Sequence, residues 1–251
     1  MTDGFLKFEQ AVPPAIAAEC ADLLWREIDA EPDDPATWKQ PVYWVAGLAQ
    51  EPFVRAANVP VLLDAFDALV GPGRWAPRDS IGAFPLRFPH AEEPDDAGWH
   101  IESSYQLPGH DEWRVNVHST GRALLMLFLF TDVDERNAPT RIRVGSHMDV
   151  PPILAKYGSE GVFMPDVCPE IAAASAHRPL AYATGHAGDV FLCHPFLVHA
   201  AQPHHGDRPR FMAQPPLMPG PGWELGPYAL AVTDVEPSPV GRTIREALGH
   251  P

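Results

Sequence analysis

The stretch Leu124-Leu-Met-Leu-Phe-Leu-Phe130 is apolar at every position, which sets it apart from the rest of the chain. Side chains of a β-strand point alternately to its two faces, so a strand of this composition must be covered on both sides. We therefore predict a central strand of a β-sheet, with helices from the N-terminal part of the chain packed on its outer face.

Short β-rich runs separated by turn residues surround this strand from Ser80 onward. The 30 prolines and 19 glycines are spread along the chain, which favours many turns and argues against an all-helical bundle. This pattern is typical of a β-sandwich or barrel. The expected strands cover residues 81–88, 113–119, 124–133, 140–144, 189–193 and 210–214.

The first third of the chain is predicted to be mainly helical. Pro13-Pro14 precede a stretch with an apolar face, which indicates a helix over residues 15–30. A second helix over residues 60–70 ends at Gly71-Pro72-Gly73. Because no linker interrupts the chain, we expect a single domain. Its parts would be a helical buttress (1–78), a β core (79–216) and a proline-rich C-terminal wrap (217–251).

The formal net charge of −15 argues against nucleic acid or an anionic membrane as a partner, because both attract basic surfaces. A neutral or cationic small-molecule substrate fits this charge better. Three cysteines, Cys20, Cys168 and Cys193, are too few and too far apart for a disulfide framework. With no basic and apolar leader at the N-terminus, we predict a soluble cytoplasmic protein, either a monomer or a homodimer.

The tetrapeptide Trp99-His100-Ile101-Glu102 is a candidate metal-binding motif. On a β-strand, residues two apart share a face, so the imidazole and the carboxylate would converge while Ile101 packs on the other side. His199, which ends a distant apolar strand, is the candidate second imidazole. Two histidines and one carboxylate leave three positions of an octahedral ion open for a chelating 2-oxo acid and O2. His-x-Glu alone is a weak signal, because chance exposed pairs are common.

Arg210 strengthens this interpretation, because it follows His199 by eleven residues, after a turn that would bring the two strands side by side. A guanidinium at that place can bind the far carboxylate of 2-oxoglutarate through two hydrogen bonds.

With these motifs in order, the chain resembles the phytanoyl-CoA dioxygenase family of iron(II) and 2-oxoglutarate oxygenases over about Ile81 to Pro216. The resemblance implies a mainly β fold with flanking helices, the double-stranded β-helix of jelly-roll or cupin type. It also implies Fe(II) held by His100, Glu102 and His199, with 2-oxoglutarate and O2 as co-substrates. The matching motifs are Trp99-His-Ile-Glu102, Leu129-Phe-Thr-Asp-Val133, Asn137-Ala-Pro-Thr-Arg141, Val144-Gly-Ser-His147, Gly188-Asp189, His199 and Arg210.

Two positions depart from the family pattern. Glu102 stands where the family usually has Asp, which keeps the carboxylate ligand and disfavours halogenation, a reaction whose enzymes lack it. Ala201 stands where the family often has a Ser that helps to hold the co-substrate. By position, Arg87 and Thr140 are the other candidate contacts to 2-oxoglutarate.

The resemblance implies that 2-oxoglutarate is converted to succinate and CO2 while a substrate is hydroxylated or closed into a ring. The size and motifs are similar to orthoester-forming oxygenases of orthosomycin antibiotics, so we expect a small natural product, a sugar or aminoglycoside. Acidic residues flank the motif and would attract ammonium groups or form a solvated loop. They are Glu92, Glu93, Asp95, Asp96, Asp111 and Glu112.

Two other functions remain open: a cupin-like metalloenzyme that does not use 2-oxoglutarate, and a non-catalytic small-molecule-binding barrel. Arg210 argues against the first, and the complete ligand set argues against the second. Among the remaining histidines, we expect His194 and His147 to be structural and His204-His205 to be solvated in a turn. The tryptophans are expected in the core or at its rim, with the wall of the metal pocket as an alternative for Trp99, and Cys193 is expected to be buried packing.

Overall fold

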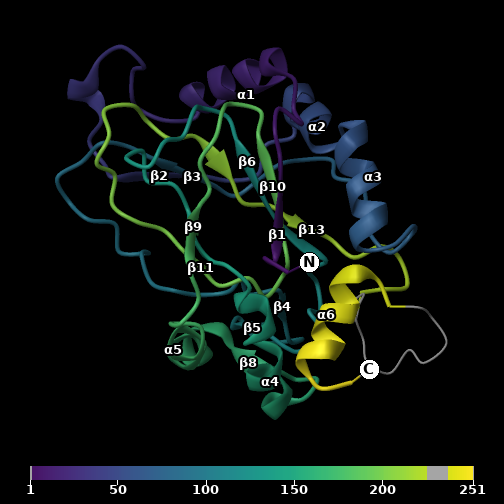
Figure 1. The fold of residues 1–251 in the computed structure, drawn as a ribbon. Helices are drawn as coiled ribbons and strands as arrows, with labels where there is room; N and C mark the ends of the chain where they lie inside the picture. The colour runs from purple at the N-terminus through teal and green to yellow at the C-terminus, as the bar shows by residue number, and fades with distance from the viewer. Residues whose placement is uncertain (1, 225–236, 251) are drawn as a thin grey trace.

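The computed structural model describes residues 2–224 and 237–250, and its centre is an antiparallel sheet (Figure 1). The order of its strands is β1-β10-β6-β12, with β13 also paired to β6. The predicted central strand is thus confirmed, because β6 has partners along both edges. The strands are β1 (Phe5–Phe8), β6 (Leu124–Leu129), β10 (Val190–Cys193), β12 (Met212–Ala213) and β13 (Pro216–Leu217).

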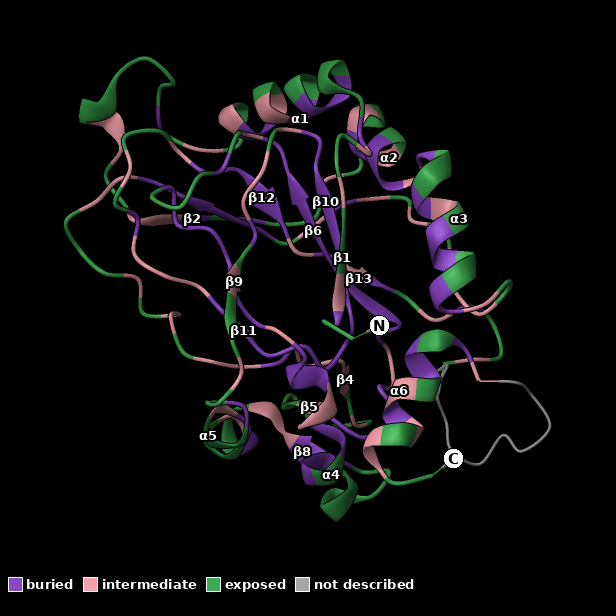
Figure 2. Cartoon of the chain, viewed as in Figure 1, coloured by how far each residue is buried: buried purple, intermediate pink, exposed green. Residues whose placement is uncertain are grey.

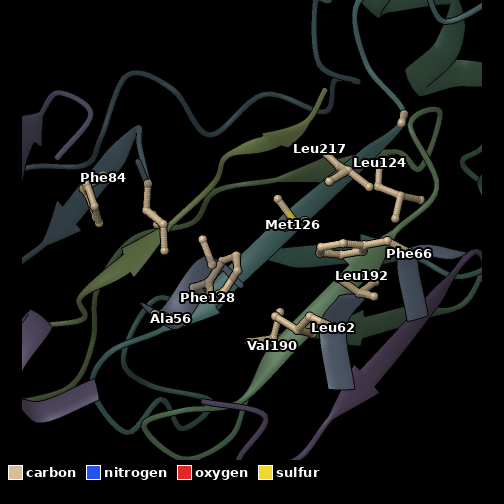
Figure 3. Close-up of a cluster of buried hydrophobic side chains, with 14 of the residues drawn as sticks. Ala56, Leu62, Phe66, Phe84, Leu124, Met126, Phe128, Val190, Leu192 and Leu217 are labelled. Carbon is tan, nitrogen blue, oxygen red and sulfur yellow. The ribbon is translucent and has the colours of Figure 1, made fainter. Parts of the chain in front are cut away.

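Both faces of β6 are buried, as the composition of this strand predicts (Figure 2). Leu124, Met126 and Phe128 belong to the larger apolar cluster, which includes residues of the N-terminal helices. Figure 3 shows this cluster, where Leu62 and Phe66 lie with the side chains of β6 and β10. The alternate residues Leu125, Leu127 and Leu129 belong to a second cluster on the other face.

Three helices cover the outer face of this sheet (Figure 1). Helix α1 (Pro14–Arg26) ends four residues before the predicted end, and α3 (Pro60–Leu69) agrees with the prediction to one residue. Helix α2 (Glu51–Ala57) was not predicted, although it begins with the Glu-Pro pair that is common in a first helical turn. A short 3-10 helix, η1 (Pro35–Thr37), precedes it.

Smaller antiparallel sheets complete the barrel. One has the order β11-β7-β9, another β4-β5-β8, and β2 pairs with β3. Single backbone bridges join Arg87 to Arg210 and His100 to His199. The strands are β2 (Val42–Val45), β3 (Phe84–Arg87), β4 (Tyr105–Gln106), β5 (Trp113–Val115), β7 (Arg141–Arg143), β8 (Val162–Phe163), β9 (Leu180–Tyr182) and β11 (His199–Ala200).

This arrangement confirms a mainly β fold with flanking helices, of the double-stranded β-helix type. The strands are shorter than predicted, because bends and bridges replace regular pairing near their ends. The predicted strand at residues 210–214, for example, is paired in the sheet only at Met212–Ala213.

The second half of the chain contains helices that the sequence pattern did not indicate. Residues 225–236 of the expected C-terminal wrap (217–251) lie outside the described residues, and residues 239–247 of the same segment form a regular helix. No helix in the described ranges is long and apolar enough to cross a membrane. The helices are η2 (Ser146–Met148), α4 (Pro151–Leu154), η3 (Ala155–Tyr157), α5 (Met164–Ala174) and α6 (Pro239–Ala247).

Candidate metal centre

The fold brings His100, Glu102 and His199 together, although the second histidine is almost a hundred residues away from the first two. One potential ligand atom from each side chain lies within 4.8 Å of the others. The backbone N–H groups of His100 and His199 each donate to the other's carbonyl oxygen at 3.0 Å. His199 Nε2 lies 3.3 Å from Glu102 Oε1. The three residues that the motif singled out therefore form one cluster.

The segment that carries His100 and Glu102 is not a regular strand, so this part of the prediction is wrong. His100 forms a single bridge, and the next three residues have no strand pairing. The alternation expected of a strand is nevertheless kept, because Ile101 is fully buried and its two neighbours are only partly buried. Ile101 packs into the main apolar cluster and so anchors the motif.

Backbone carbonyl groups orient both imidazole rings. His100 Nδ1 lies 2.8 Å from the carbonyl oxygen of Gly98, and His199 Nδ1 lies 3.0 Å from that of Leu197. A carbonyl only accepts hydrogen bonds, so each Nδ1 carries a proton and Nε2 is the ring nitrogen left to face a metal. This is the usual way in which proteins prepare a histidine to bind a metal through Nε2.

The charges at the cluster favour the protonation states that a metal requires. Burial alone would raise the pKa of Glu102, but the hydrogen bond with His199 and the charge of Arg122 lower that pKa to about 2. Burial and the neighbouring His199 lower the pKa of His100. An ionised carboxylate and a neutral imidazole are both ready to coordinate a cation without losing a proton first.

Arg210 and Arg87 lie next to each other on paired backbone segments, and both side chains are buried. Arg210 donates from Nη1 to the carbonyl oxygen of Ala138 at 2.6 Å and from Nη2 to that of Pro85 at 3.1 Å. Arg87 Nη2 is 2.5 Å from Asp96 Oδ2. Three buried guanidinium nitrogens have no hydrogen-bond partner among the described residues: Arg210 Nε, Arg87 Nε and Arg87 Nη1.

Burial and the nearby charge of Arg87 lower the pKa of Arg210, whereas Asp96 acts in the opposite direction. The charge of Asp96 also acts on His100. Asp96 therefore lies within electrostatic range of both the arginine pair and the metal cluster, and its Oδ1 is buried without a partner.

The resemblance links Thr140 and position 201 to co-substrate binding, and the two residues have different surroundings in the structure. Thr140 is buried, and its hydroxyl faces the sulfur of Met212 at 3.8 Å, a weak contact. No contact in the described chain joins Thr140 to the metal cluster. The carbonyl oxygen of Ala201 accepts hydrogen bonds from the guanidinium of Arg141 at 2.6 and 3.1 Å.

The other histidines show one correct and one wrong prediction. His194 and His147 are buried and pack against each other with ring centroids 4.8 Å apart, as structural residues would. His204 was expected to be solvated but is 9% exposed. Its ring is held by the carbonyl oxygen of Arg208 at 2.9 Å and the N–H of Gly206 at 3.2 Å. Cys193 is buried, as predicted.

Two side chains near the cluster were missed by sequence reasoning. Arg122 Nη2 lies 3.7 Å from Glu102 Oε2, and nothing in the spacing of these residues indicates that contact. Trp99 packs against the main apolar cluster, and the guanidiniums of Arg141 and Arg143, which the sequence did not predict as its neighbours, lie 4.9 and 4.2 Å from its ring centroid. Because Arg141 and Arg143 are two residues apart on β7, their side chains lie on the same face of that strand.

The acidic residues that flank the motif differ in their placement. Asp96 is partly buried against Arg87, whereas the other five are exposed on the surface. These five are Glu92, Glu93, Asp95, Asp111 and Glu112.

Several solved structures have a similar fold. HygX from Streptomyces hygroscopicus, solved with nickel, 2-oxoglutarate and hygromycin B, is 16% identical, with a TM-score of 0.54 over 88% of this chain and 84% of HygX. The carbocyclase SnoK of nogalamycin biosynthesis is 15% identical, with a TM-score of 0.57 over 94% and 88%. The epimerase SnoN of the same pathway is 18% identical, with a TM-score of 0.52 over 85% and 76%. Identities this low establish the fold alone.

No curated protein sequence matches the chain. A family model described as phytanoyl-CoA dioxygenase matches residues 87–212, which is half of the chain. That range contains the three clustered residues and Arg210. The chain therefore belongs to the phytanoyl-CoA dioxygenase family.

Proposed function

We propose that this protein is an Fe(II)- and 2-oxoglutarate-dependent oxygenase in which His100, Glu102 and His199 bind the metal. The observation that carries the proposal is the convergence of these three side chains within 4.8 Å, with both Nδ1 atoms turned to carbonyl groups. Two imidazoles and one carboxylate are the donor set of non-haem iron(II) oxygenases. The residues present thus fit the metal.

The arginine pair supports 2-oxoglutarate as the co-substrate. A 2-oxo acid chelates a metal through its keto acid end, and its far carboxylate then needs a cation a few ångströms away. Arg210 and Arg87 offer buried N–H groups without partners, which a dicarboxylate would satisfy. Thr140 has no contact that supports a similar role, so its part in co-substrate binding stays a prediction from the resemblance.

The bound iron and 2-oxoglutarate would supply the oxidation of a C–H bond, with succinate and CO2 as the other products. The protein's own residues orient the reactants and hold their charges. His100 and His199 present Nε2, Glu102 neutralises part of the metal charge, and Arg210 fixes the length of dicarboxylate that fits. Hydroxylation and oxidative ring closure are both compatible with this set of residues.

We further propose that the substrate is a small natural product that contains a sugar or an amino sugar. The structure of HygX contains hygromycin B, and SnoK and SnoN belong to nogalamycin biosynthesis, which supports an antibiotic-type substrate. The net charge of −15 and the exposed acids beside the motif favour a cationic molecule. A cytoplasmic location, and a monomer or homodimer as the functional unit, remain predictions.

The test is binding and turnover with the purified protein. Without O2, addition of 2-oxoglutarate to the Fe(II)-loaded protein should give the visible charge-transfer band of a chelated 2-oxo acid. With O2, succinate should form, and sugar-containing metabolites should accelerate its formation. His199→Ala should abolish the band, and His205→Ala, an exposed neighbour, should not.

Metal binding without any effect of 2-oxoglutarate would instead indicate a cupin-like enzyme of another kind. Binding of a small molecule with neither metal nor succinate would indicate a non-catalytic barrel. Either result would rule out the proposed reaction.

A further inference from the structure

Arg122 is a buried cation beside the candidate metal centre, and the proposed reaction gives it no role. Its side chain is 9% exposed, and its Nη2 lies 3.7 Å from Glu102 Oε2. Its Nε and Nη1 have no hydrogen-bond partner in the structure. Burying a guanidinium with so few partners is unfavourable, so its presence next to a metal ligand indicates a function there.

The backbone holds Arg122 in place independently of the carboxylate ligand. Its N–H donates to the carbonyl oxygen of Ser119 at 3.1 Å, and the Ser119 hydroxyl donates back to the Arg122 carbonyl at 2.6 Å. A Cβ at Gly121, where φ is +79°, would lie 2.3 Å from the Ser104 carbonyl oxygen. The turn therefore packs directly against the segment of the metal motif. Arg122 Nη2 also donates to the carbonyl oxygen of Ser103 at 2.9 Å.

The two oxygens of Glu102 have different neighbours. Oε1 lies 3.3 Å from His199 Nε2, the ring nitrogen that the Leu197 carbonyl leaves free for a metal. Oε2 lies on the other side, toward Arg122. Oε1 is therefore the oxygen that faces the metal position, and Oε2 faces the buried cation.

This difference matters because a carboxylate binds a metal through one oxygen or through both. With one oxygen, two histidines and a carboxylate leave three octahedral positions open, as a chelating 2-oxo acid and O2 require; with both oxygens, a position is lost. Glu has an additional rotatable bond compared with Asp, so it has more freedom to turn its second oxygen toward the metal.

We propose that Arg122 is a positioning residue, which keeps Glu102 a single-oxygen ligand by holding Oε2 away from the metal. The inference rests on the proposed function, because it assumes a metal at His100, Glu102 and His199. It also accounts for Glu at this position, since the longer side chain reaches both the metal position and Arg122.

The test uses Co(II), which does not turn over with O2, and compares Arg122→Met and Arg122→Lys with Arg114→Met as the matched control. The Arg114 guanidinium also donates to backbone carbonyls, those of Glu160 and Gly161, but it does not contact the metal motif. Calorimetry measures the affinity of 2-oxoglutarate for the Co(II)-saturated proteins. The visible Co(II) spectrum, recorded before 2-oxoglutarate is added, reports the number of ligands.

We expect Arg122→Met to weaken 2-oxoglutarate binding by about tenfold or more, the usual effect of losing a residue that orients a metal ligand. Its Co(II) spectrum should shift toward a higher coordination number. Arg122→Lys, which keeps the charge with a single nitrogen, should be intermediate. Arg114→Met should equal the wild type in both measurements.

Wild-type affinity and an unchanged spectrum in Arg122→Met would overturn the inference, as would a Co(II) complex of the wild type with both Glu102 oxygens on the metal. If Arg122→Met does not fold, Arg122→Lys is measured in its place. Wild-type 2-oxoglutarate affinity and an unchanged Co(II) spectrum in that variant would also overturn the inference. A wild-type protein that binds neither Co(II) nor 2-oxoglutarate would contradict the proposed function itself, which is a separate result.

Discussion

Arg87 and Arg210 are paired by two backbone hydrogen bonds, at 3.0 and 2.8 Å. Their buried side chains therefore extend from directly opposite residues of two adjacent segments. Two like charges are rarely buried side by side without an anion between or near them. Asp96 partly supplies that anion in the ligand-free chain, through Arg87. The N–H groups that have no partner among the described residues are those that a second carboxylate would satisfy.

Replacing Arg210 should therefore weaken 2-oxoglutarate binding more than it weakens metal binding. We expect Arg210→Lys to raise the Kd of 2-oxoglutarate by about tenfold to a hundredfold, because lysine keeps the charge but lacks the fixed fork of the guanidinium, and a lost hydrogen bond to a charged group costs about 1.5–3 kcal/mol. Arg87→Met should have a smaller effect in the same direction. Calorimetry on the Co(II)-loaded proteins gives both values. Unchanged 2-oxoglutarate affinity in Arg210→Lys would remove this residue from the co-substrate site.

Asp96 should compete with the co-substrate for Arg87, because its carboxylate already forms an ion pair with that guanidinium. We expect Asp96→Asn to tighten 2-oxoglutarate binding by about three- to tenfold, or ~1 kcal/mol, the range of a modest ion pair. Asp95→Asn is the matched control, since Asp95 is adjacent, exposed and carries the same charge. Weaker binding in Asp96→Asn would mean that Asp96 orients Arg87 for the co-substrate rather than competing with it.

His204 should make the stability of the protein depend on pH. Burial lowers the pKa of His204 to about 4, below the usual histidine value of about 6.5, and both ring nitrogens already have partners that suit the neutral form. The unfolded chain takes up this proton at a higher pH than the folded chain does. Stability is therefore complete above pH ~6.5 and falls as the pH drops toward about 4.

Urea unfolding at several pH values measures this effect. His204→Asn should flatten the curve between these limits, although it should lower stability at neutral pH through loss of the bond to Arg208. His205→Asn, at the exposed neighbouring position, should keep the wild-type slope. A wild-type slope in His204→Asn would show that other groups cause the pH dependence.

The second apolar cluster should contribute to stability as a closely packed core does. Leu127 is 1% exposed on the face of β6 that the helices do not cover. Leu127→Ala should lower the free energy of unfolding by about 2–5 kcal/mol, the usual loss for a buried leucine. Leu180→Ala, at a site that is 51% exposed, should change it by less than ~0.5 kcal/mol. Similar values of Tm for the two variants would contradict this assignment of the core.

The features that the sequence predicts well are those with a local pattern. The all-apolar run of β6 requires burial on both faces, and Gly71-Pro72-Gly73 ends α3 because these residues cannot continue a helix. His100, Glu102, His199 and Arg210 were selected because the chemistry of an iron(II) site limits both the residue types and their spacing, and their role as a site is a proposal. The structure brings the first three together within 4.8 Å.

The features that the sequence did not predict depend on contacts between distant segments. Nothing near Arg122 in the chain shows that it faces Glu102, because a turn against the Ser104 carbonyl produces that contact. The burial of His204 was missed for a similar reason, since a short loop usually lies on the surface. Helix α5 was missed because Pro169 lies inside it, a residue that normally argues against a helix interior.

The stacking of Trp99 with Arg141 and Arg143 has an evolutionary consequence. His100 has only one bridge, to His199 of β11, so the indole ring beside it ties the ligand to β7, the next strand beyond β11. A smaller side chain at position 99 would leave two partly buried cations without their aromatic surface. Among homologous enzymes, these three positions should consequently be exchanged together or kept together, even though none of them touches iron.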